Sequence, residues 1–186
     1  GKSTVAAMLR EAGIPVLDAD RISRDVTAPG GRAYDAVVRA FGREILRDDG
    51  SIDRKRLGEI VFADPASRVR LERITHPAIF EAMKEEIARI EREGHRVVVV
   101  EATLIHELGR KGLFEAVISV TSDRETAISR LIARDAMSRR QAEARLHAQM
   151  DADRKAGASD HVIDNSGDIE STRGQVERLA RILLGA

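Results

Sequence analysis

The chain begins with Gly1-Lys2-Ser3-Thr4 and continues with the apolar run Val5-Ala6-Ala7-Met8-Leu9, which predicts a helix directly after the tetrapeptide. The same four residues close the phosphate-binding pattern G-x-x-x-x-G-K-[ST]. In that pattern the glycine lets the backbone approach a phosphate, the lysine neutralises phosphate charge, and the hydroxyl binds Mg²⁺. The N-terminus of the following helix also points its N–H groups at the anion. We therefore expect a nucleotide-phosphate site formed by Gly1, Lys2, Ser3 and Thr4, with Ser3 also a metal ligand.

A complete motif of this kind also contains a buried strand and an upstream glycine. Neither precedes Gly1, and the chain does not begin with Met. We expect that an N-terminal strand, which is central in the sheet of such folds, is missing from the chain. Because a short motif also occurs by chance, two interpretations stay open at this point: a phosphate site, or a helix start in an inactive, truncated scaffold.

The composition bears on the class of protein. The 31 basic and 31 acidic side chains give a net charge of zero, so nothing global indicates a nucleic-acid or membrane-surface partner. The absence of cysteine excludes disulfides and thiolate metal sites. No apolar stretch approaches the ~20 residues of a membrane span, and no signal peptide is visible. We expect one cytoplasmic domain over residues 1–186, as a monomer or a small homo-oligomer.

Helix and strand patterns alternate along the chain, which predicts an α/β fold with a parallel sheet. Apolar residues at spacings of three and four predict the helices, and Pro77 suits the first turn of one of them. The pairs Ser122 with Glu125 and Ser138 with Gln141 resemble capping boxes at two further helix starts. Short β-branched runs predict strands at 14–18, 96–100, 116–120 and 161–163.

The stretch 27–63 has the pattern of a helical insertion. Ala33, Val37 and Phe41 line one expected helix, and Leu57 and Ile60 line the next. The turn sequence Asp48-Asp49-Gly50-Ser51 separates the two. We expect a helical substrate-side subdomain here, extending towards residue 92.

Two acidic positions follow predicted strands. Asp18 and Asp20 lie at the end of the first strand, and a parallel α/β sheet gathers its ligands at the carboxyl ends of its strands. Residues two apart share one face of a strand, so both carboxylates are candidates for orienting a hydroxyl and accepting its proton. Asp20 is also a candidate N-cap of the next helix, and for either aspartate alone a cap and a base are equally good interpretations. Glu101 ends the strand 97–100 and is either a Mg²⁺ ligand, as in a Walker-B segment, or a plain polar strand end.

Arginines are frequent between residues 124 and 157. Such runs are usually solvated helix faces, and nearby acids support that interpretation for some of them. Arg134 shares a helix face with Arg130, however, and Arg145 shares the face of the next helix with Gln149. A helical hairpin that closes arginines over a polyphosphate is typical of the lid of a small-molecule kinase. We therefore predict a lid at 124–157 with phosphate-binding arginines.

His76 precedes Pro77, and a residue before proline is pushed away from the helical region. Its ring is then a candidate for a cleft, although a lone histidine is more often a helix cap or a surface contact. With no second histidine at a ligand spacing, no transition-metal site is indicated.

Short motifs follow one another along the whole chain, and their combination is far more specific than any one of them. Their order is GKST, Asp18-Ala19-Asp20, Pro29-Gly30, Phe41-Gly42, Asp49-Gly50, Asp53-Arg54, His76-Pro77, Arg139 with Arg145 and Gln149, and Val162-Ile163-Asp164-Asn165. In this order the chain resembles bacterial dephospho-coenzyme A kinases. The resemblance implies a three-layer P-loop kinase-like fold and ATP-dependent phosphorylation of the ribose 3′-hydroxyl of dephospho-coenzyme A (dephospho-CoA), the last step of coenzyme A synthesis.

The resemblance also implies roles for individual positions. Asp20 matches the presumed base, Lys2 and Ser3 match the phosphate loop, and Asn165 matches the region beside the adenine of ATP. The full expected set comprises Lys2, Asp20 and Arg139 as catalytic residues; Gly1, Lys2, Ser3, Thr4, Arg134, Arg145 and Asn165 for ATP; Asp20, Arg54 and His76 for dephospho-CoA; and Ser3 and Glu101 for Mg²⁺.

The chain departs from the family pattern after its predicted second strand. Where the family typically has a Pro-Leu-Leu segment that ends in an acid, this chain has Glu101-Ala102-Thr103-Leu104-Ile105-His106-Glu107. The proline is absent, so Glu107 is not among the expected site residues. Another P-loop kinase for a nucleotide or small alcohol is the alternative activity, and the insertion at 27–63 with Arg54 and His76 argues against it.

Overall fold

The computed structural model describes residues 1–102, 114–147 and 156–185. The chain divides into two compact units, of which one comprises Gly1–Val16 with Thr103–Ala186 and the other Leu17–Ala102. No helix within the described ranges is both long and apolar enough to cross a membrane.

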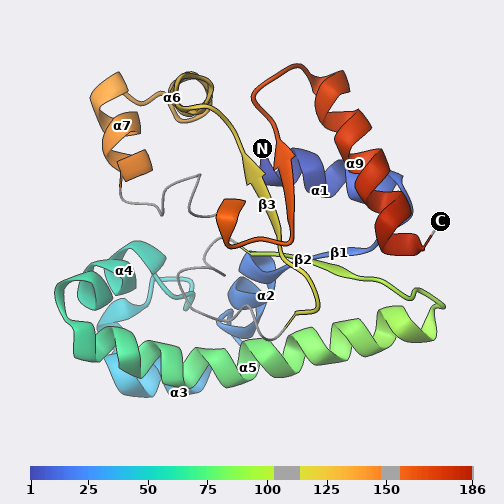
Figure 1. The fold of residues 1–186 in the computed structure, drawn as a ribbon. Helices are drawn as coiled ribbons and strands as arrows, with labels where there is room; N and C mark the ends of the chain where they lie inside the picture. The colour runs from blue at the N-terminus through green and yellow to red at the C-terminus, as the bar shows by residue number, and fades with distance from the viewer. Residues whose placement is uncertain (103–113, 148–155, 186) are drawn as a thin grey trace. The chain divides into compact units, whose positions relative to one another are not determined.

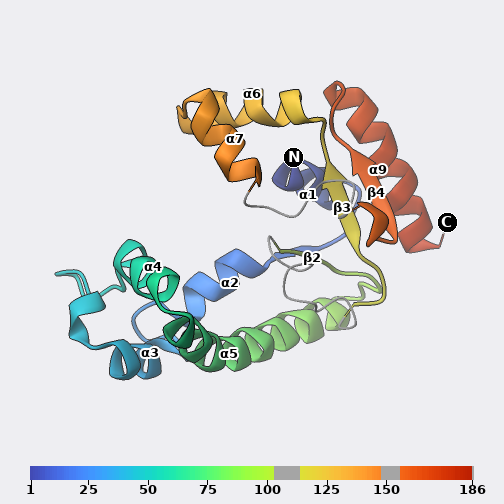
Figure 2. The ribbon, with the colours of Figure 1, turned by 60° about the vertical axis from the view of Figure 1, so that its left-hand side comes forward.

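The first unit is built around a parallel pair of strands. β3 (Ile118–Thr121) pairs with β4 (His161–Asp164) in a register that runs from Ile118 opposite His161 to Thr121 opposite Asp164. Helix α9 (Ile169–Leu184) packs against β4 and against α1 (Lys2–Glu11), as Figures 1 and 2 show. The strands predicted at 116–120 and 161–163 therefore form, and they are parallel.

The two helices of this core bury apolar stripes of helical spacing. In α1 the buried residues follow the exposed first turn and are Val5, Ala6, Met8 and Leu9. In α9 Val176 lies four positions after Thr172 and is followed three and four positions later by Leu179 and Ala180. Such stripes supply most of the stability of short helices in water. The predicted first and last helices are confirmed by this packing.

A helical hairpin follows β3. It consists of α6 (Arg124–Asp135) and α7 (Arg139–His147), and Ala136 between them is left-handed with φ 51°. Figure 2 shows α7 folded back beneath α6. The capping box of Ser138 and Gln141 is confirmed, since each donates its backbone N–H to the other side chain, at 2.9 and 3.3 Å. The cap predicted at Ser122 is wrong: Asp123 lies directly before α6, and its carboxylate accepts the N–H of Thr126 at 2.9 Å.

The second unit pairs β1 (Val16–Asp18) with β2 (Val99–Glu101) and continues with helices. These are α2 (Ala19–Val26), α3 (Tyr34–Phe41), a 3₁₀ turn η1 (Arg43–Ile45), α4 (Arg54–Ala63) and α5 (Pro65–Arg92). Figure 1 shows α5 as the long green helix with which α2, α3 and α4 are in contact. Of the apolar residues expected in the insertion, Ala33, Val37, Phe41 and Leu57 are buried in one cluster. Ile45 and Ile52 complete this cluster, and the expected Ile60 packs against it while partly buried.

The long helix α5 overturns the predicted helix start at Pro77. The helix begins at Pro65, where the Asp64 carboxylate caps it, and it continues through Pro77 to Arg92. An interior proline costs about 3 kcal/mol because it removes one backbone hydrogen bond. Packing offsets this cost: Leu71 and Ile74 lie against the buried cluster before the proline, and residues after it are buried as well. Pro77 itself is exposed.

Candidate active site

The first turn of α1 forms the exposed end of a well-anchored helix. Gly1 is the N-cap residue, and its carbonyl accepts the N–H of Val5 at 3.1 Å. Lys2, Ser3 and Thr4 are exposed, and the first turn carries no acidic side chain. A helix N-terminus with a positive partial charge and a lysine beside it favours an anion. The local geometry therefore suits the predicted phosphate site.

Asn165 lies directly beside Gly1, although the two are far apart in the sequence. A Cβ atom at position 1 would overlap the side-chain amide nitrogen of Asn165, so any larger residue there would force Asn165 to shift. Asn165 is buried, its N–H donates to the carbonyl of Thr121 at 2.8 Å, and its Oδ1 accepts from Thr172 Oγ1 at 3.0 Å. Arg130 Nη1 donates to its carbonyl at 2.6 Å. Two residues predicted to bind ATP thus come together in the first unit.

Replacing Thr172 by valine tests how firmly Asn165 is held. Thr172 is fully buried, and its hydroxyl is the donor to Asn165 Oδ1. Valine keeps the shape but leaves that buried oxygen without its donor, so we expect Thr172→Val to lower the free energy of unfolding by about 1–3 kcal/mol. Urea denaturation measures the difference.

Thr75→Val is the matched control for this substitution. Thr75 is also buried in a helix, and its hydroxyl donates to the carbonyl of Leu71 at 2.9 Å, which is a backbone group rather than a side chain. We expect a loss below about 1 kcal/mol there, since no buried side chain loses its donor. Equal losses in the two variants would contradict a specific hold on Asn165.

Two predicted lid arginines share one carboxylate. Arg134 donates from Nε and Nη2 to the two oxygens of Asp135, at 2.7 and 2.8 Å, and Arg145 Nη1 donates to Asp135 Oδ2 at 2.9 Å. The hydrogen bonds and charges of Arg134 and Arg145 lower the pKa of Asp135 below its usual value. Arg134 comes from α6 and Arg145 from α7, so Asp135 links the two helices and brings both guanidinium groups to one place.

The third predicted lid arginine also binds carboxylates. Arg139 begins α7, and its Nη2 donates to both oxygens of Glu125 at 2.7 and 2.9 Å while Nε donates to Glu143 at 3.0 Å. Hydrogen bonds to Glu125 and Glu143 raise its pKa. Carboxylates and phosphates accept hydrogen bonds from a guanidinium in the same fork geometry. In this structure the three arginines therefore form ion pairs with nearby acids on exposed helix faces, as the alternative interpretation of this run expects. Gln149, the expected neighbour of Arg145, lies outside the described residues.

The two aspartates after β1 have different positions from those expected. β1 ends at Asp18, whose side chain accepts the N–H of Arg21 at 2.9 Å and caps α2. Asp20 lies in the first turn of α2, so the strand-face argument for the pair is wrong, and so is the interpretation of Asp20 as the N-cap. The helix starts two residues earlier than that interpretation requires, because Asp18 is the N-cap and its carboxylate accepts the N–H of Arg21. The carboxylate of Asp20 is exposed at the helix start.

Arg54 extends from the start of α4 to the end of α2. Its Nη2 donates to Thr27 Oγ1 at 2.7 Å and to the carbonyl of Arg24 at 3.3 Å. Partial desolvation and the positive charges of Arg24 and Arg47 lower the pKa of Arg54. An arginine whose neighbours include other cations is suited to receiving an anion. This environment agrees with a substrate-binding residue.

His76 lies within α5 and not in the extended segment that Pro77 predicts. Its ring meets Phe80, one turn further on, in an edge-to-face contact with centroids 6.3 Å apart and planes at 76°. The continuous helix, held by packing on both sides of Pro77, keeps the His76 backbone helical. The structure therefore corrects the reason for selecting His76, while its side chain remains partly accessible.

The two expected metal ligands lie in different units of the chain. Ser3 is in the exposed first turn of α1, and Glu101 is the partly buried last residue of β2. No group of three or more His, Cys, Asp or Glu residues in the described parts of the chain is arranged to hold a metal ion. Glu107 lies outside the described residues.

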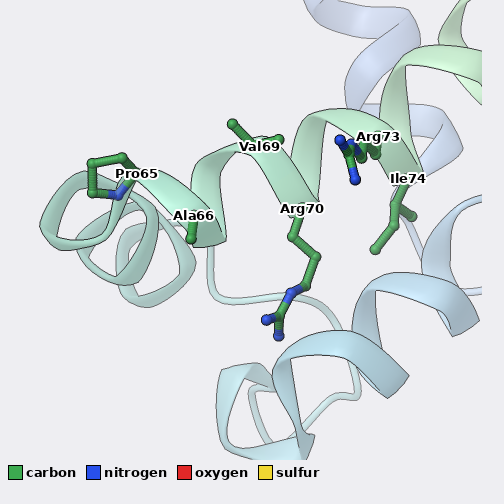
Figure 3. A pocket seen from close by; sticks show the side chains of 6 residues that line it. All are labelled: Pro65, Ala66, Val69, Arg70, Arg73 and Ile74. Carbon is green, nitrogen blue, oxygen red and sulfur yellow. The ribbon is translucent and has the colours of Figure 1, made fainter.

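A surface hollow on α5 contains none of the expected site residues. Figure 3 shows that its wall comes from one helix alone and combines apolar with basic side chains. The lining residues are Pro65, Ala66, Val69, Arg70, Arg73 and Ile74. Its chemistry gives no reason to place the reaction there.

Sequence reasoning missed several partners of the expected residues. The acids near the lid arginines were visible in the sequence, and Asp135, which binds Arg134 and Arg145, is one of them. No local pattern indicates that Arg47 approaches Arg54 or that Thr172 binds Asn165. These contacts depend on turns and packing between separate elements.

Comparisons with known proteins agree with this geometry. The family model of dephospho-CoA kinase (CoaE) matches residues 1–171. The dephospho-CoA kinase of Anaeromyxobacter dehalogenans is 45% identical over 185 residues, which cover 100% of this chain and 88% of that protein. The dephospho-CoA kinase of Geobacter sulfurreducens is 45% identical over 179 residues, which cover 96% of this chain and 91% of that protein.

Solved structures show the same likeness. The crystal structure of TT1252 from Thermus thermophilus has a TM-score of 0.82 at 31% identity, covering 100% of this chain and 91% of that one. A dephospho-CoA kinase from Campylobacter jejuni has a TM-score of 0.71 at 28% identity, covering 99% and 92%. The expected α/β kinase fold is thus confirmed. With a family match that extends from the phosphate-binding tetrapeptide past Asn165 to residue 171, the chain belongs to the dephospho-CoA kinase family.

Proposed function

We propose that this protein transfers the γ-phosphoryl group of ATP to the ribose 3′-hydroxyl of dephospho-CoA, giving coenzyme A and ADP. The family match over residues 1–171 carries the proposal. The arrangement of the expected residues within each unit supports it, because the first unit holds candidates for ATP and the second holds candidates for the acceptor.

In this proposal the first turn of α1 binds the polyphosphate. Gly1 and Thr4 contribute backbone N–H groups near the positive end of the helix, and Lys2 neutralises charge on the transferred group. Asn165 lies beside the adenine. The exposed positions of residues 2–4 and the contact of Gly1 with Asn165 support these roles.

The acceptor is activated by Asp20. Its carboxylate takes the proton of the 3′-hydroxyl while the hydroxyl oxygen attacks the γ-phosphorus, and the bond from that phosphorus to the bridging oxygen of ADP breaks. Arg139, with Arg134 and Arg145, stabilises the charge on the transferred group. Arg54 and His76 bind the acceptor. The exposed position of Asp20 and the cationic surroundings of Arg54 support this assignment.

Mg²⁺ fits the donors that the chain offers. The Ser3 hydroxyl and the Glu101 carboxylate are hard oxygen ligands, and Mg²⁺ typically takes only one or two protein ligands besides phosphate oxygens and water. When bound, the ion neutralises phosphate charge. Ser3 would bind it directly, and Glu101 would do so directly or through water.

The same proposal covers the organisation of the protein. Residues 1–186 act as one kinase domain, with a substrate subdomain at 27–63 that extends towards 92 and a lid at 124–157. Dephospho-CoA is the partner, with no nucleic acid or membrane involved. A cytoplasmic location agrees with a chain that contains no cysteine, and we expect a monomer or a small homo-oligomer.

The decisive experiment measures ADP release by the native protein with ATP and Mg²⁺. Dephospho-CoA, AMP and a reaction without acceptor are compared. Release that depends on dephospho-CoA supports the proposal, and mass spectrometry of the product should show one added phosphate on the ribose. Release with AMP alone would instead identify a nucleotide kinase, and no release with any acceptor would indicate an inactive protein.

A further inference from the structure

On the exposed face of α2, the proposed general base Asp20 and the arginine Arg24 lie one helical turn apart. Asp20 and Arg24 are four positions apart and both exposed, whereas Ile22 and Val26 are buried on the opposite side of the helix. Side chains at this spacing are neighbours on a helix surface. Whatever Asp20 binds therefore lies next to the guanidinium of Arg24.

Two further arginines come close to Arg24 from outside α2. Arg54 Nη2 donates to the carbonyl of Arg24 at 3.3 Å, which brings its guanidinium to the last turn of the same helix. Arg47 Nη2 lies 3.9 Å from Oδ1 of Asp53, the residue directly before Arg54, and the charge of Arg47, like that of Arg24, lowers the pKa of Arg54. The three arginines thus form one cationic cluster.

The carboxylates near this cluster are engaged in capping helices. Asp18, the ion-pair partner of Arg24, caps α2, and Asp53, the partner of Arg47, caps α4 by accepting the N–H groups of Lys55 and Arg56. The closest nitrogen–oxygen separations of the two pairs are 3.8 and 3.9 Å, too long for hydrogen bonds. The guanidinium groups therefore retain hydrogen-bond donors for another anion.

The geometry points to a subsite in which Arg24, Arg47 and Arg54 bind the 5′-pyrophosphate of the acceptor. This inference rests on the proposed function, because it takes dephospho-CoA as the acceptor and Asp20 as its base. It adds Arg24 and Arg47 to the expected acceptor-binding residues. It also names the 5′-pyrophosphate as the part of the acceptor that these arginines bind.

The shape of the acceptor matches the spacing on α2. The 3′-hydroxyl and the 5′-phosphate belong to the same ribose and are separated by roughly the 5–6 Å between side chains one helical turn apart. A ribose whose 3′-hydroxyl meets Asp20 therefore places its 5′-phosphate within reach of Arg24. The second phosphate then extends towards Arg54, and binding two charged groups fixes the orientation of the hydroxyl.

Arg24→Gln tests the subsite. Arg24 has a side chain that is 60% exposed, so the variant should fold, and circular dichroism with thermal melting checks this. Loss of charged hydrogen bonds to phosphate should raise the KM for dephospho-CoA about tenfold or more, with the KM for ATP unchanged. Arg21→Gln is the control: Arg21 is also on α2, is 77% exposed and pairs with Asp25. We expect its KM values to equal those of the unaltered protein.

Inorganic pyrophosphate identifies the group that is bound. At saturating ATP it should inhibit the unaltered protein competitively against dephospho-CoA, and Arg24→Gln should weaken this inhibition by a similar factor. Equal inhibition of both proteins, or a KM for dephospho-CoA within twofold of normal in Arg24→Gln, would overturn the subsite. If the unaltered protein does not phosphorylate dephospho-CoA at all, the proposed function itself has failed.

Discussion

Asp20→Asn is expected to lower turnover with dephospho-CoA by at least ~100-fold, because general-base removal typically costs this much. Asparagine keeps the shape of the side chain but cannot accept the proton of the hydroxyl. ATP should still bind, since the phosphate-binding candidates lie on α1 and not on α2. Steady-state kinetics and nucleotide-binding calorimetry measure the two effects separately.

We expect Asp20→Asn to leave the start of α2 intact. Asp18, and not Asp20, caps this helix, and the Asp20 charge in the first turn interacts favourably with the helix dipole. Asp25→Asn is the matched control, because Asp25 is an exposed carboxylate on the same helix that pairs with Arg21. Near-normal turnover in Asp20→Asn would remove Asp20 from the mechanism, as would an equal loss in Asp25→Asn.

Arg139→Ala is the second substitution with a large expected effect. Removing a guanidinium that stabilises a transferred phosphoryl group typically costs ~100-fold or more in turnover. The melting temperature should change little, since Arg139 is exposed and exposed ion pairs contribute weakly to stability. The comparison of turnover with thermal unfolding therefore separates a catalytic role from a structural one.

Glu125→Gln tests whether Arg139 supports turnover only by holding α7 against α6. Glu125 lies on α6 and accepts two hydrogen bonds from Arg139, so the substitution weakens the link between the helices but keeps the guanidinium. We expect turnover close to normal in this variant. A loss as large as that in Arg139→Ala, or a large drop in melting temperature in either variant, would make Arg139 a structural residue.

Much of the fold was predictable because its signals are local. The apolar stripe of α1, the capping box of Ser138 and Gln141, and the strand at 161–163 each depend on residues that are close in the chain. The family resemblance was equally accessible, since it rests on short motifs in a fixed order. The family model agrees with it over residues 1–171.

The errors arose where a local rule met a competing interaction. Pro77 is a valid helix-start signal, but the buried cluster beside α5 stabilises the helix on both sides of it. Ser122 is a good capping residue, yet Asp123 is better placed by one position. Aspartate is a favoured N-cap residue, but Asp18 and not Asp20 is the N-cap of α2. In each case a neighbour or a packed surface determined which of two plausible structures forms.

The amino-acid sequence alone was sufficient to identify most helices and strands, the family and most candidate side chains. Periodicity, helix caps and the order of motifs all depend on residues that are close in the chain. They did not show that Asn165 fits against Gly1, that Asp135 holds Arg134 and Arg145 together, or that Arg54 reaches the end of α2. Those contacts join elements separated by turns whose path is set by burial of apolar surface across the whole unit. Only the folded chain establishes which charges become neighbours, and the proposed chemistry depends on those neighbours.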